Sequence, residues 1–402
     1  MSGMKFKTLL LGAAAAAAAA TAQAADLPVA PEPVDYVRVC DAYGSRFYYI
    51  PGTETCLRVG GRLRTQFVVN NVMDDGDWAD RGEDGYTWLT RGYAYLDART
   101  ATEFGTLRAY VALRMQIENG ASGYKLDAGY IQWGGLTAGY LASNFNIYTG
   151  QVYVGVVTRD WSDASMNQIA YTAAFGDGFS ATIALEDRTA RDVSFTDADG
   201  DASVGGTRVP DLVAALGVSQ GWGSAQISGA LHQVYPDSTR NGFFGGGVDA
   251  LGWAIGAGVN VNLPFANSGS NVYFQGFYAD GALSYIGNGI TGLTIGDIGY
   301  ISDATDGDTN SGFSLSSGVY LQATPTVGLA VDGSYARIDM EYAGLMDDAT
   351  FERWAIDGSV VWEPVSGFGI GADVGYSNSS VDIDGVDDLD ELLFGVRMQR
   401  TF

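Results

Sequence analysis

Histidine and cysteine are nearly missing from this 402-residue chain, which has one histidine, His232, and two cysteines, Cys40 and Cys56. Metal sites need several such ligands close together, and the sequence contains no CxxC motif, so we expect no metal and no cofactor. Catalytic sites of hydrolases usually place a histidine beside a nucleophile. With a single histidine among polar neighbours, the chain is expected not to be an enzyme.

Positive charge is also scarce. The chain has 22 lysines and arginines against 47 aspartates and glutamates, which gives a formal net charge of −25. Proteins that bind nucleic acid need a basic surface for the phosphates. Nucleic acid is therefore excluded as an expected partner.

Long hydrophobic runs are absent except at the start of the chain. Lys5 and Lys7 precede an apolar run at 9–20, and the small-residue sequence AQA follows at 22–24. This pattern predicts a secretory signal peptide over 1–24. A membrane anchor is the alternative, but the run is shorter than the roughly 18 to 20 residues of a spanning helix.

The predicted signal peptide makes this an exported protein, which bears on its two cysteines. Exported proteins meet an oxidising compartment, so Cys40 and Cys56 are expected to form a disulfide. Closing a loop of this size stabilises a chain by roughly 3 kcal/mol in the loop-entropy treatment. We expect residues 25–56 to form an amino-terminal segment that contains this disulfide hairpin.

What the sequence has in abundance is two-residue alternation. In the stretch RWAIDGSVVWEPVSGFGIGADVGYS, apolar residues occupy every second position on each side of a short turn. Aromatics stand at both ends of these rows, at Trp354, Trp362, Phe368 and Tyr376. Eight residues of a tilted strand cover roughly 20 Å, close to the ~25 Å apolar band of an outer-membrane barrel with its aromatic girdles. A soluble sandwich would place aromatics in the middle of its strands.

Similar segments recur along the chain. They pair across short turns as seven hairpins, with one more segment at each end: 57–70, 86–100 with 106–118, 124–133 with 136–142, 167–175 with 179–187, 211–219 with 224–233, 250–262 with 271–280, 313–323 with 327–338, 352–362 with 368–377, and 391–402. An even number of strands lets the first and last pair and removes both sheet edges. The predicted fold is all-β, a transmembrane antiparallel barrel of 16 strands over 57–402. Short turns at one rim and longer loops at the other are typical of this class. The second of the longer connections, 119–123, is very short.

The chain resembles a known family. The block VDYVRVCDAYGSRFYYIPGTETCLRVGG, the preceding ADLPVAPEP and the terminal QRTF are similar to the porins of alphaproteobacterial outer membranes. The resemblance implies a sixteen-stranded trimeric barrel for passive diffusion, with a third loop folded into the lumen. It also implies that Phe402 is the terminal aromatic favoured by the barrel-assembly machinery. Arg400 departs from the family, which often has an aromatic there, and the short second loop lacks the length of a subunit latch.

Strand parity predicts which side chains line the lumen. Arg58, Arg62 and Arg64 alternate with apolar residues in the first strand, and Arg91 and Arg114 hold the matching positions in the next two. A charge on the lipid face near the membrane centre costs roughly 2 to 4 kcal/mol, so the arginines are expected to face water. They are the predicted basic wall of a constriction. An alternative is that they only solvate the lumen.

The third loop is the predicted acidic side of that constriction. It is long and aromatic, and it offers Asp160 and Asp163. Carboxylates that face a row of arginines create a transverse field, which orients polar solutes.

The expected protein is an outer-membrane porin, a water-filled channel for small hydrophilic solutes and ions. A sugar- or anion-selective channel of the same architecture is the alternative. Expected partners are outer-membrane lipid and lipopolysaccharide, the barrel-assembly machinery, and two further copies in a homotrimer. The disulfide hairpin is expected at the periplasmic, short-turn rim.

Overall fold

The computed structural model describes residues 38–402 except for gaps at 74–75, 80, 83, 192, 194–205, 236–249, 293, 296–298, 302, 306–307, 341–347 and 384. The expected signal peptide over 1–24 lies outside the described residues, as does 25–37 of the expected amino-terminal segment.

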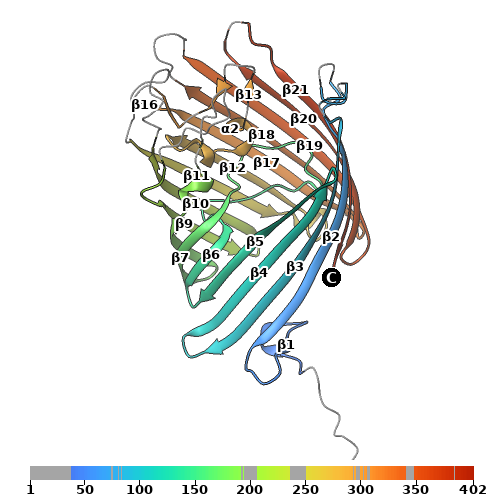
Figure 1. The fold of residues 1–402 in the computed structure, drawn as a ribbon. Coiled ribbons are helices and arrows are strands. Elements are labelled where there is room, and N and C mark those ends of the chain that lie inside the picture. Colours follow the sequence, from blue (N-terminus) through green and yellow to red (C-terminus); the bar gives the residue numbers. More distant parts are fainter. Residues whose placement is uncertain are drawn as a thin grey trace, which may run out of the picture.

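A closed barrel dominates the fold (Figure 1). Among the described residues its sixteen antiparallel strands are β2 (Cys56–Val69), β3 (Tyr86–Thr102), β4 (Gly105–Glu118), β5 (Ala121–Trp133), β6 (Leu136–Ala142), β7 (Ser165–Gly176), β8 (Phe179–Glu186), β9 (Asp211–Gln220), β10 (Gly223–Val234), β11 (Ala250–Asn262), β12 (Asn271–Asp280), β17 (Ser311–Thr324), β18 (Val327–Met340), β19 (Ala349–Val365), β20 (Phe368–Val381) and β21 (Leu389–Thr401). Each of the sixteen expected segments overlaps one of these strands. The predicted fold class is confirmed.

The first and last barrel strands close the sheet. β2 and β21 pair antiparallel from Arg62 with Thr401 to Val69 with Phe394. Gly61 and Phe402 extend the pairing, because each backbone N–H donates to the other's carbonyl at 3.0 Å. No barrel edge is left open along this seam, which removes the template that an exposed strand offers for aggregation.

One expected loop is shorter than the sequence indicated. The segment 119–123 was expected to connect two strands, but β4 and β5 pair up to Glu118 and Ala121. Only Asn119 and Gly120 turn the chain, with φ of 45° and 83°. Both residues have positive φ, as in the tight two-residue turns that join twisted antiparallel strands.

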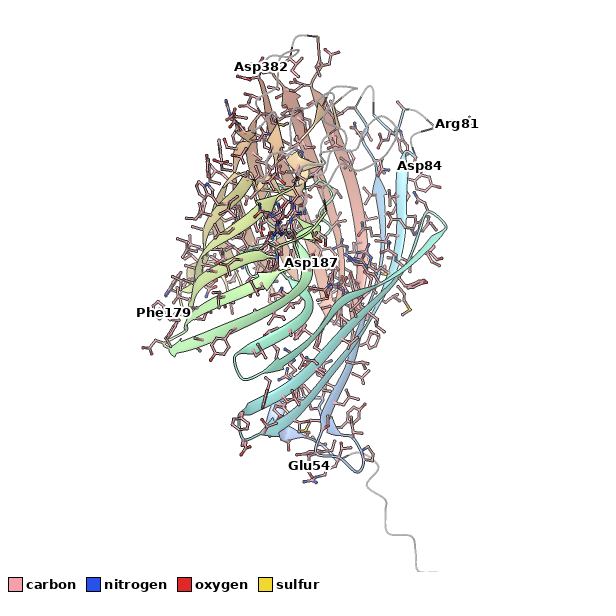
Figure 2. The ribbon with its side chains drawn as sticks, turned by 60° about the vertical axis from the view of Figure 1, so that its left-hand side comes forward. Glu54, Arg81, Asp84, Phe179, Asp187 and Asp382 are labelled. Carbon is pink, nitrogen blue, oxygen red and sulfur yellow. A yellow bond between two sulfur atoms is a disulfide. The ribbon has the colours of Figure 1, made fainter. Side chains whose placement is uncertain are left out.

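The two faces of the sheet differ as the alternation predicted. On β19, Trp354 and Trp362 are 43% and 50% exposed on the outer face, whereas Ala355 and Asp357 on the inner face are 2% and 0% exposed. In the view of Figure 2, side chains project outward from the strands, and Phe179 at the edge of the barrel is an exposed example. An apolar exterior around a polar interior is the arrangement of a barrel that sits in lipid.

The disulfide hairpin stands at the short-turn end of the barrel. The short 3-10 helix η1 (Asp41–Tyr43) is followed by β1 (Tyr48–Tyr49), which pairs with the start of β2. Cys40 and Cys56 are joined by the expected disulfide, and both pack against Phe47. Figure 2 places Glu54 of this hairpin at the opposite end of the molecule from Asp382.

A second group of apolar residues packs inside the barrel, toward the long-loop end. η5 (Leu283–Tyr285) and α2 (Asn288–Thr291) bring Tyr285, Ile286 and Ile290 against inward-facing residues such as Phe277 and Ile338. The inward fold of the segment after β12 was not among the predictions from the sequence. The other short elements are η2 (Arg188–Ala190), η4 (Pro264–Ala266), β13 (Thr294–Ile295), β14 (Gly299–Tyr300), β15 (Ala304–Thr305) and β16 (Asp308–Thr309). Within the described residues, no helix has the length and apolarity to cross a membrane.

Candidate functional site

Four of the five predicted wall arginines gather around Tyr93 on the inner face of β2–β4. Arg64 and Arg91 lie directly opposite each other across the β2–β3 ladder. The Arg62 guanidinium lies 4.1 Å from the centre of the Tyr93 ring, and Arg64 Nη2 donates to the Tyr93 hydroxyl at 3.1 Å. Arg114 faces Tyr93 from β4. The structure therefore brings Arg62, Arg64, Arg91 and Arg114 together, and we call these four residues the basic wall.

Arg58 belongs to a different cluster, nearer the short-turn end. It lies 3.4 Å from the carboxylate of Asp97, which also binds Arg99 at 2.8 Å and Arg108 at 2.9 Å. Arg58 and Arg99 stand over the Phe47 ring of the disulfide hairpin, at 5.1 and 5.0 Å from its centre. Asp97 thus forms ion pairs with three arginines next to the disulfide hairpin. Arg58 belongs to this cluster and is separate from the basic wall.

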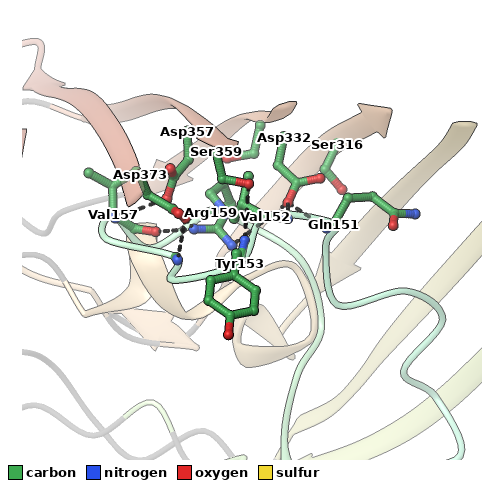
Figure 3. A network of polar contacts seen from close by, with 12 residues as sticks. Gln151, Val152, Tyr153, Val157, Arg159, Ser316, Asp332, Asp357, Ser359 and Asp373 are labelled. Carbon is green, nitrogen blue, oxygen red and sulfur yellow. Dashed lines mark hydrogen bonds and ion pairs between the residues drawn. The ribbon is translucent and has the colours of Figure 1, made fainter. Parts of the chain in front are cut away.

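The segment between β6 and β7, residues 143–164, is bound to the inner face of the opposite wall (Figure 3). Asp332 on β18 accepts hydrogen bonds from the backbone N–H groups of Gln151 at 2.6 Å and Val152 at 2.9 Å. Tyr273 donates to the other oxygen of the same carboxylate at 3.0 Å. One buried side chain therefore satisfies two loop donors.

The next two strands repeat this arrangement. Asp373 on β20 accepts from the N–H groups of Val154 at 2.7 Å and Gly155 at 2.9 Å. Asp357 on β19 accepts from the N–H of Val156 at 2.8 Å and from Arg159 Nη1 at 3.0 Å. Three carboxylates on consecutive strands thus replace the β-ladder partners that this extended backbone lacks. We call Asp332, Asp357 and Asp373 the carboxylate anchors.

Glycines make room for the segment on β20 and β21. A Cβ atom at Gly371 would lie 2.5 Å from Cδ1 of Tyr153, and one at Gly395 would lie 2.4 Å from Cγ1 of Val156. No side chain fits at these two inward positions while the segment keeps its place. The glycine-rich sequence of β20 is therefore explained by this close approach.

Two arginines hold the carbonyl groups of the same segment. Arg397 on β21 donates to the carbonyls of Tyr153 and Val154, and its Nη2 also reaches the side-chain oxygen of Gln66 at 2.7 Å. Arg353 on β19 donates to the carbonyl of Thr158 at 2.7 Å. Because Gln66 lies on β2 beside Arg64, Arg397 joins the segment to the edge of the basic wall.

The two aspartates predicted for the acidic side of the constriction lie elsewhere in the lumen. Asp160 is fully buried, 2.9 Å from Arg353 Nη1, and it accepts the N–H of Ile290 at 2.7 Å. Its carboxylate fastens 143–164 to the wall and to α2. Asp163 is exposed, and its backbone carbonyl accepts a hydrogen bond from Asn288. Among the described residues, neither carboxylate lies within 4.0 Å of a basic-wall arginine.

His232 is buried in the contact between the barrel and η5. Its Nδ1 lies 2.9 Å from the carboxylate of Asp211, which accepts the Tyr285 hydroxyl at 2.6 Å. Burial raises the pKa of the Tyr285 hydroxyl well above its usual range, and Asp211 adds to the shift, so the hydroxyl stays a neutral donor. This network fixes η5 to β9 and β10.

The predicted aromatic positions lie on the outer face. Trp354 and Tyr376 contact each other across β19 and β20, with ring centres 5.1 Å apart. Trp362 is half exposed and Phe368 lies at the start of β20. Phe402 is exposed beside Gly61 at the seam.

The carboxylate anchors, Arg353 and Arg397 were not predicted as functional residues from the sequence. Their positions in the alternating strands are those of the inner face, which is a usable signal for their importance. This signal did not show that their partners are backbone groups of residues 151–158. Those contacts join parts of the chain that are about 180 to 245 residues apart, for example Asp332 with Gln151 and Arg397 with Tyr153.

A closed sixteen-stranded barrel with an apolar outer face, a polar lumen and a bound internal segment defines the class of outer-membrane channels. The model of the porin subfamily matches residues 26–390, and the chain belongs to this family. It is 34% identical to Porin Omp2b of Brucella suis over 432 aligned positions, covering 99% of this chain and 100% of the relative.

Solved structures with low sequence identity share the fold. The outer membrane channel DcaP of Acinetobacter baumannii has a TM-score of 0.62 at 15% identity, covering 88% of this chain and 99% of that one. OmpT of Vibrio cholerae in its trimer form has a TM-score of 0.52 at 10% identity, covering 87% and 100%. The protein is therefore an outer-membrane porin, a channel for diffusion, and its family groups it with channels rather than enzymes.

Proposed function

We propose that small hydrophilic solutes and ions cross this porin through a constriction between residues 143–164 and the basic wall. The observation that carries the proposal is the position of Arg397, whose guanidinium contacts both the segment at Tyr153 and the β2 side chain Gln66. The segment is thereby held beside the basic wall at Gln66, in the second half of β2. Narrowing at this level sets the size limit of the channel.

Charge is unevenly distributed across this constriction. The basic wall lies on β2–β4, while the carboxylate anchors lie on β18–β20 behind the segment. On the segment itself, Asp163 offers an exposed carboxylate, whereas the charge of Asp160 is paired with Arg353. β20 and β2 are separated by β21 alone, so the two charge groups occupy neighbouring parts of the lumen wall. Opposite charges on different parts of the wall produce a field in the pore, which favours polar and charged solutes over apolar ones.

The test is electrical. Replacing Arg62 and Arg64 by glutamine should change the single-channel conductance and the reversal potential in a salt gradient across a planar bilayer. Arg337→Gln is the matched control, because Arg337 lies in an exposed ion pair with Asp339 outside the lumen. Unchanged values in the double variant would show that neither arginine lines the constriction.

A second experiment distinguishes general diffusion from a selective channel. In liposome swelling, uptake that saturates with one sugar would favour the selective alternative over general diffusion.

A homotrimer is the proposed assembly, and OmpT in its trimer form has the same fold. β6 has seven residues and β8 has eight, whereas β3 and β19 have seventeen. Seven or eight tilted residues rise only about 18 to 20 Å, less than the ~25 Å apolar band. A second copy is therefore proposed to cover the β6–β8 side. Disulfide cross-linking of Ile169→Cys copies on exposed β7 would support this, and a monomeric mass in detergent would contradict it.

The remaining partners follow from the proposed location. Residues 1–24 are proposed to direct export, and Phe402 to act as the signal for the barrel-assembly machinery. The apolar exterior is proposed to contact outer-membrane lipid and lipopolysaccharide, with the disulfide hairpin at the periplasmic rim. No enzymatic activity is proposed, since His232 is committed to Asp211 in a buried contact.

A further inference from the structure

Arg64 and Arg91 face each other on neighbouring strands, although like charges directly opposite one another destabilise a sheet. Arg62 shares their side of the wall, where its guanidinium covers the Tyr93 ring. Three positive charges therefore meet at one place in the lumen, around a single aromatic side chain.

These three arginines differ from the other arginines on β2–β4 in their partners. Arg58, Arg99 and Arg108 share the Asp97 carboxylate, and Arg114 lies 3.4 Å from Asp127. In the part of the chain that the structure describes, no carboxylate lies within 4.0 Å of Arg62, Arg64 or Arg91. The Nε atom of each is buried and has no hydrogen-bond partner there.

Neighbouring polar groups do not compensate this charge. The side-chain oxygen of Gln66 accepts from Arg397, so it is already engaged. Tyr93 offers one hydroxyl, which accepts from Arg64. A guanidinium presents five donors in a planar fork, so Arg62, Arg64 and Arg91 retain many more donors than their neighbours accept.

We propose that Arg62, Arg64 and Arg91 form a binding site for small oxyanions, the carboxylate, phosphate and sulfate class, at the narrowest part of the pore. The proposal rests on the proposed function, because it places the site in the diffusion path. Oxyanions match the fork geometry of arginine and relieve the repulsion between Arg64 and Arg91. A site that binds and still releases its ion raises the flux of anions through the channel.

The experiment uses inorganic phosphate as the probe. Single-channel current of the purified protein is recorded in potassium chloride while phosphate is added at constant pH. We expect a saturating decrease in chloride current. Arg64→Gln and Arg91→Gln should each raise the half-blocking phosphate concentration about tenfold, since each removes a charge-assisted hydrogen bond. Arg64→Lys keeps the charge but not the fork, so it should show a smaller increase.

Arg337→Gln is the control, because it removes the same charge outside the lumen and should leave the block unchanged. A difference in migration between the unheated and the heated protein in detergent gels verifies that each variant folds. A wild-type channel that conducts without a saturable block, or the same block in Arg64→Gln and Arg91→Gln, would overturn the oxyanion site and leave the diffusion channel standing. A folded barrel that conducts no ions would overturn both.

Discussion

Asp332 and Asp357 lie directly opposite each other on β18 and β19, and both carboxylates bind the same internal segment. Two like charges at such a position repel one another. Here the repulsion is balanced by backbone N–H groups and by Arg159, which lies 3.0 Å from Asp357 and 3.9 Å from Asp332. The wall and the segment therefore stabilise each other. The pair Arg64 and Arg91 has no such balance from the described residues, which is why a ligand is proposed only there.

Removing one carboxylate anchor should loosen the segment. Asp332→Ala leaves the N–H groups of Gln151 and Val152 without their acceptor, and unsatisfied buried donors cost about 1–3 kcal/mol each. We expect a lower temperature for loss of the folded barrel in detergent gels and a noisier single-channel current. Asp339→Ala on the same strand is the control, because Asp339 is exposed and pairs with Arg337. Equal behaviour of the two variants would contradict the anchoring role.

A side chain at Gly371, one of the glycines that make room for residues 143–164, should displace this segment. Gly371→Val places side-chain atoms where Cδ1 of Tyr153 lies, only 2.5 Å from the added Cβ. The segment then has to move off β20, so the conductance should change while the barrel still forms. Gly333→Val is the matched control, because its Cβ on the outer face of β18 would have its nearest neighbour at 3.6 Å. A Gly371→Val channel with wild-type conductance would show that the segment does not border the pore there.

Much of the barrel was predictable because its signal is local. Alternation at every second residue located all sixteen strands, and the hairpin 250–262 with 271–280 has the predicted bounds. β19 runs to Val365 instead of 362, because its pairing with β20 continues through an irregularity between Trp362 and Val365. Sequence parity does not report such a shift in register.

The interior was less predictable because its contacts are long-range. Asp160 is predicted from the sequence as the acidic side of a constriction on a long, aromatic loop, yet its partners are Arg353 and Ile290, more than 120 residues away. The same holds for η5, whose apolar residues pack on Phe277 and Ile338 inside the barrel. Parity identifies the inward face of each strand, but only the closed structure shows which segment covers it.

The buried pair of Asp160 and Arg353 gives a stability prediction. Arg353→Met leaves Asp160 buried with its charge unpaired, which typically costs about 3–5 kcal/mol. The double variant Asp160→Leu with Arg353→Met should recover part of this loss, because neither charge remains. The measurement is the denaturant midpoint of the folded barrel in detergent. A double variant less stable than Arg353→Met alone would contradict the pairing.

The most direct test of the account asks which face of the sheet meets water in the pore. Both native cysteines form the disulfide, so one introduced cysteine is the single free thiol of the described chain. A charged, water-soluble thiol reagent is added during bilayer recording. It should cause an abrupt change in the current through the Arg114→Cys channel and leave the current through the Trp354→Cys channel unchanged. A current step with Trp354→Cys and none with Arg114→Cys would contradict a barrel closed around a water-filled channel.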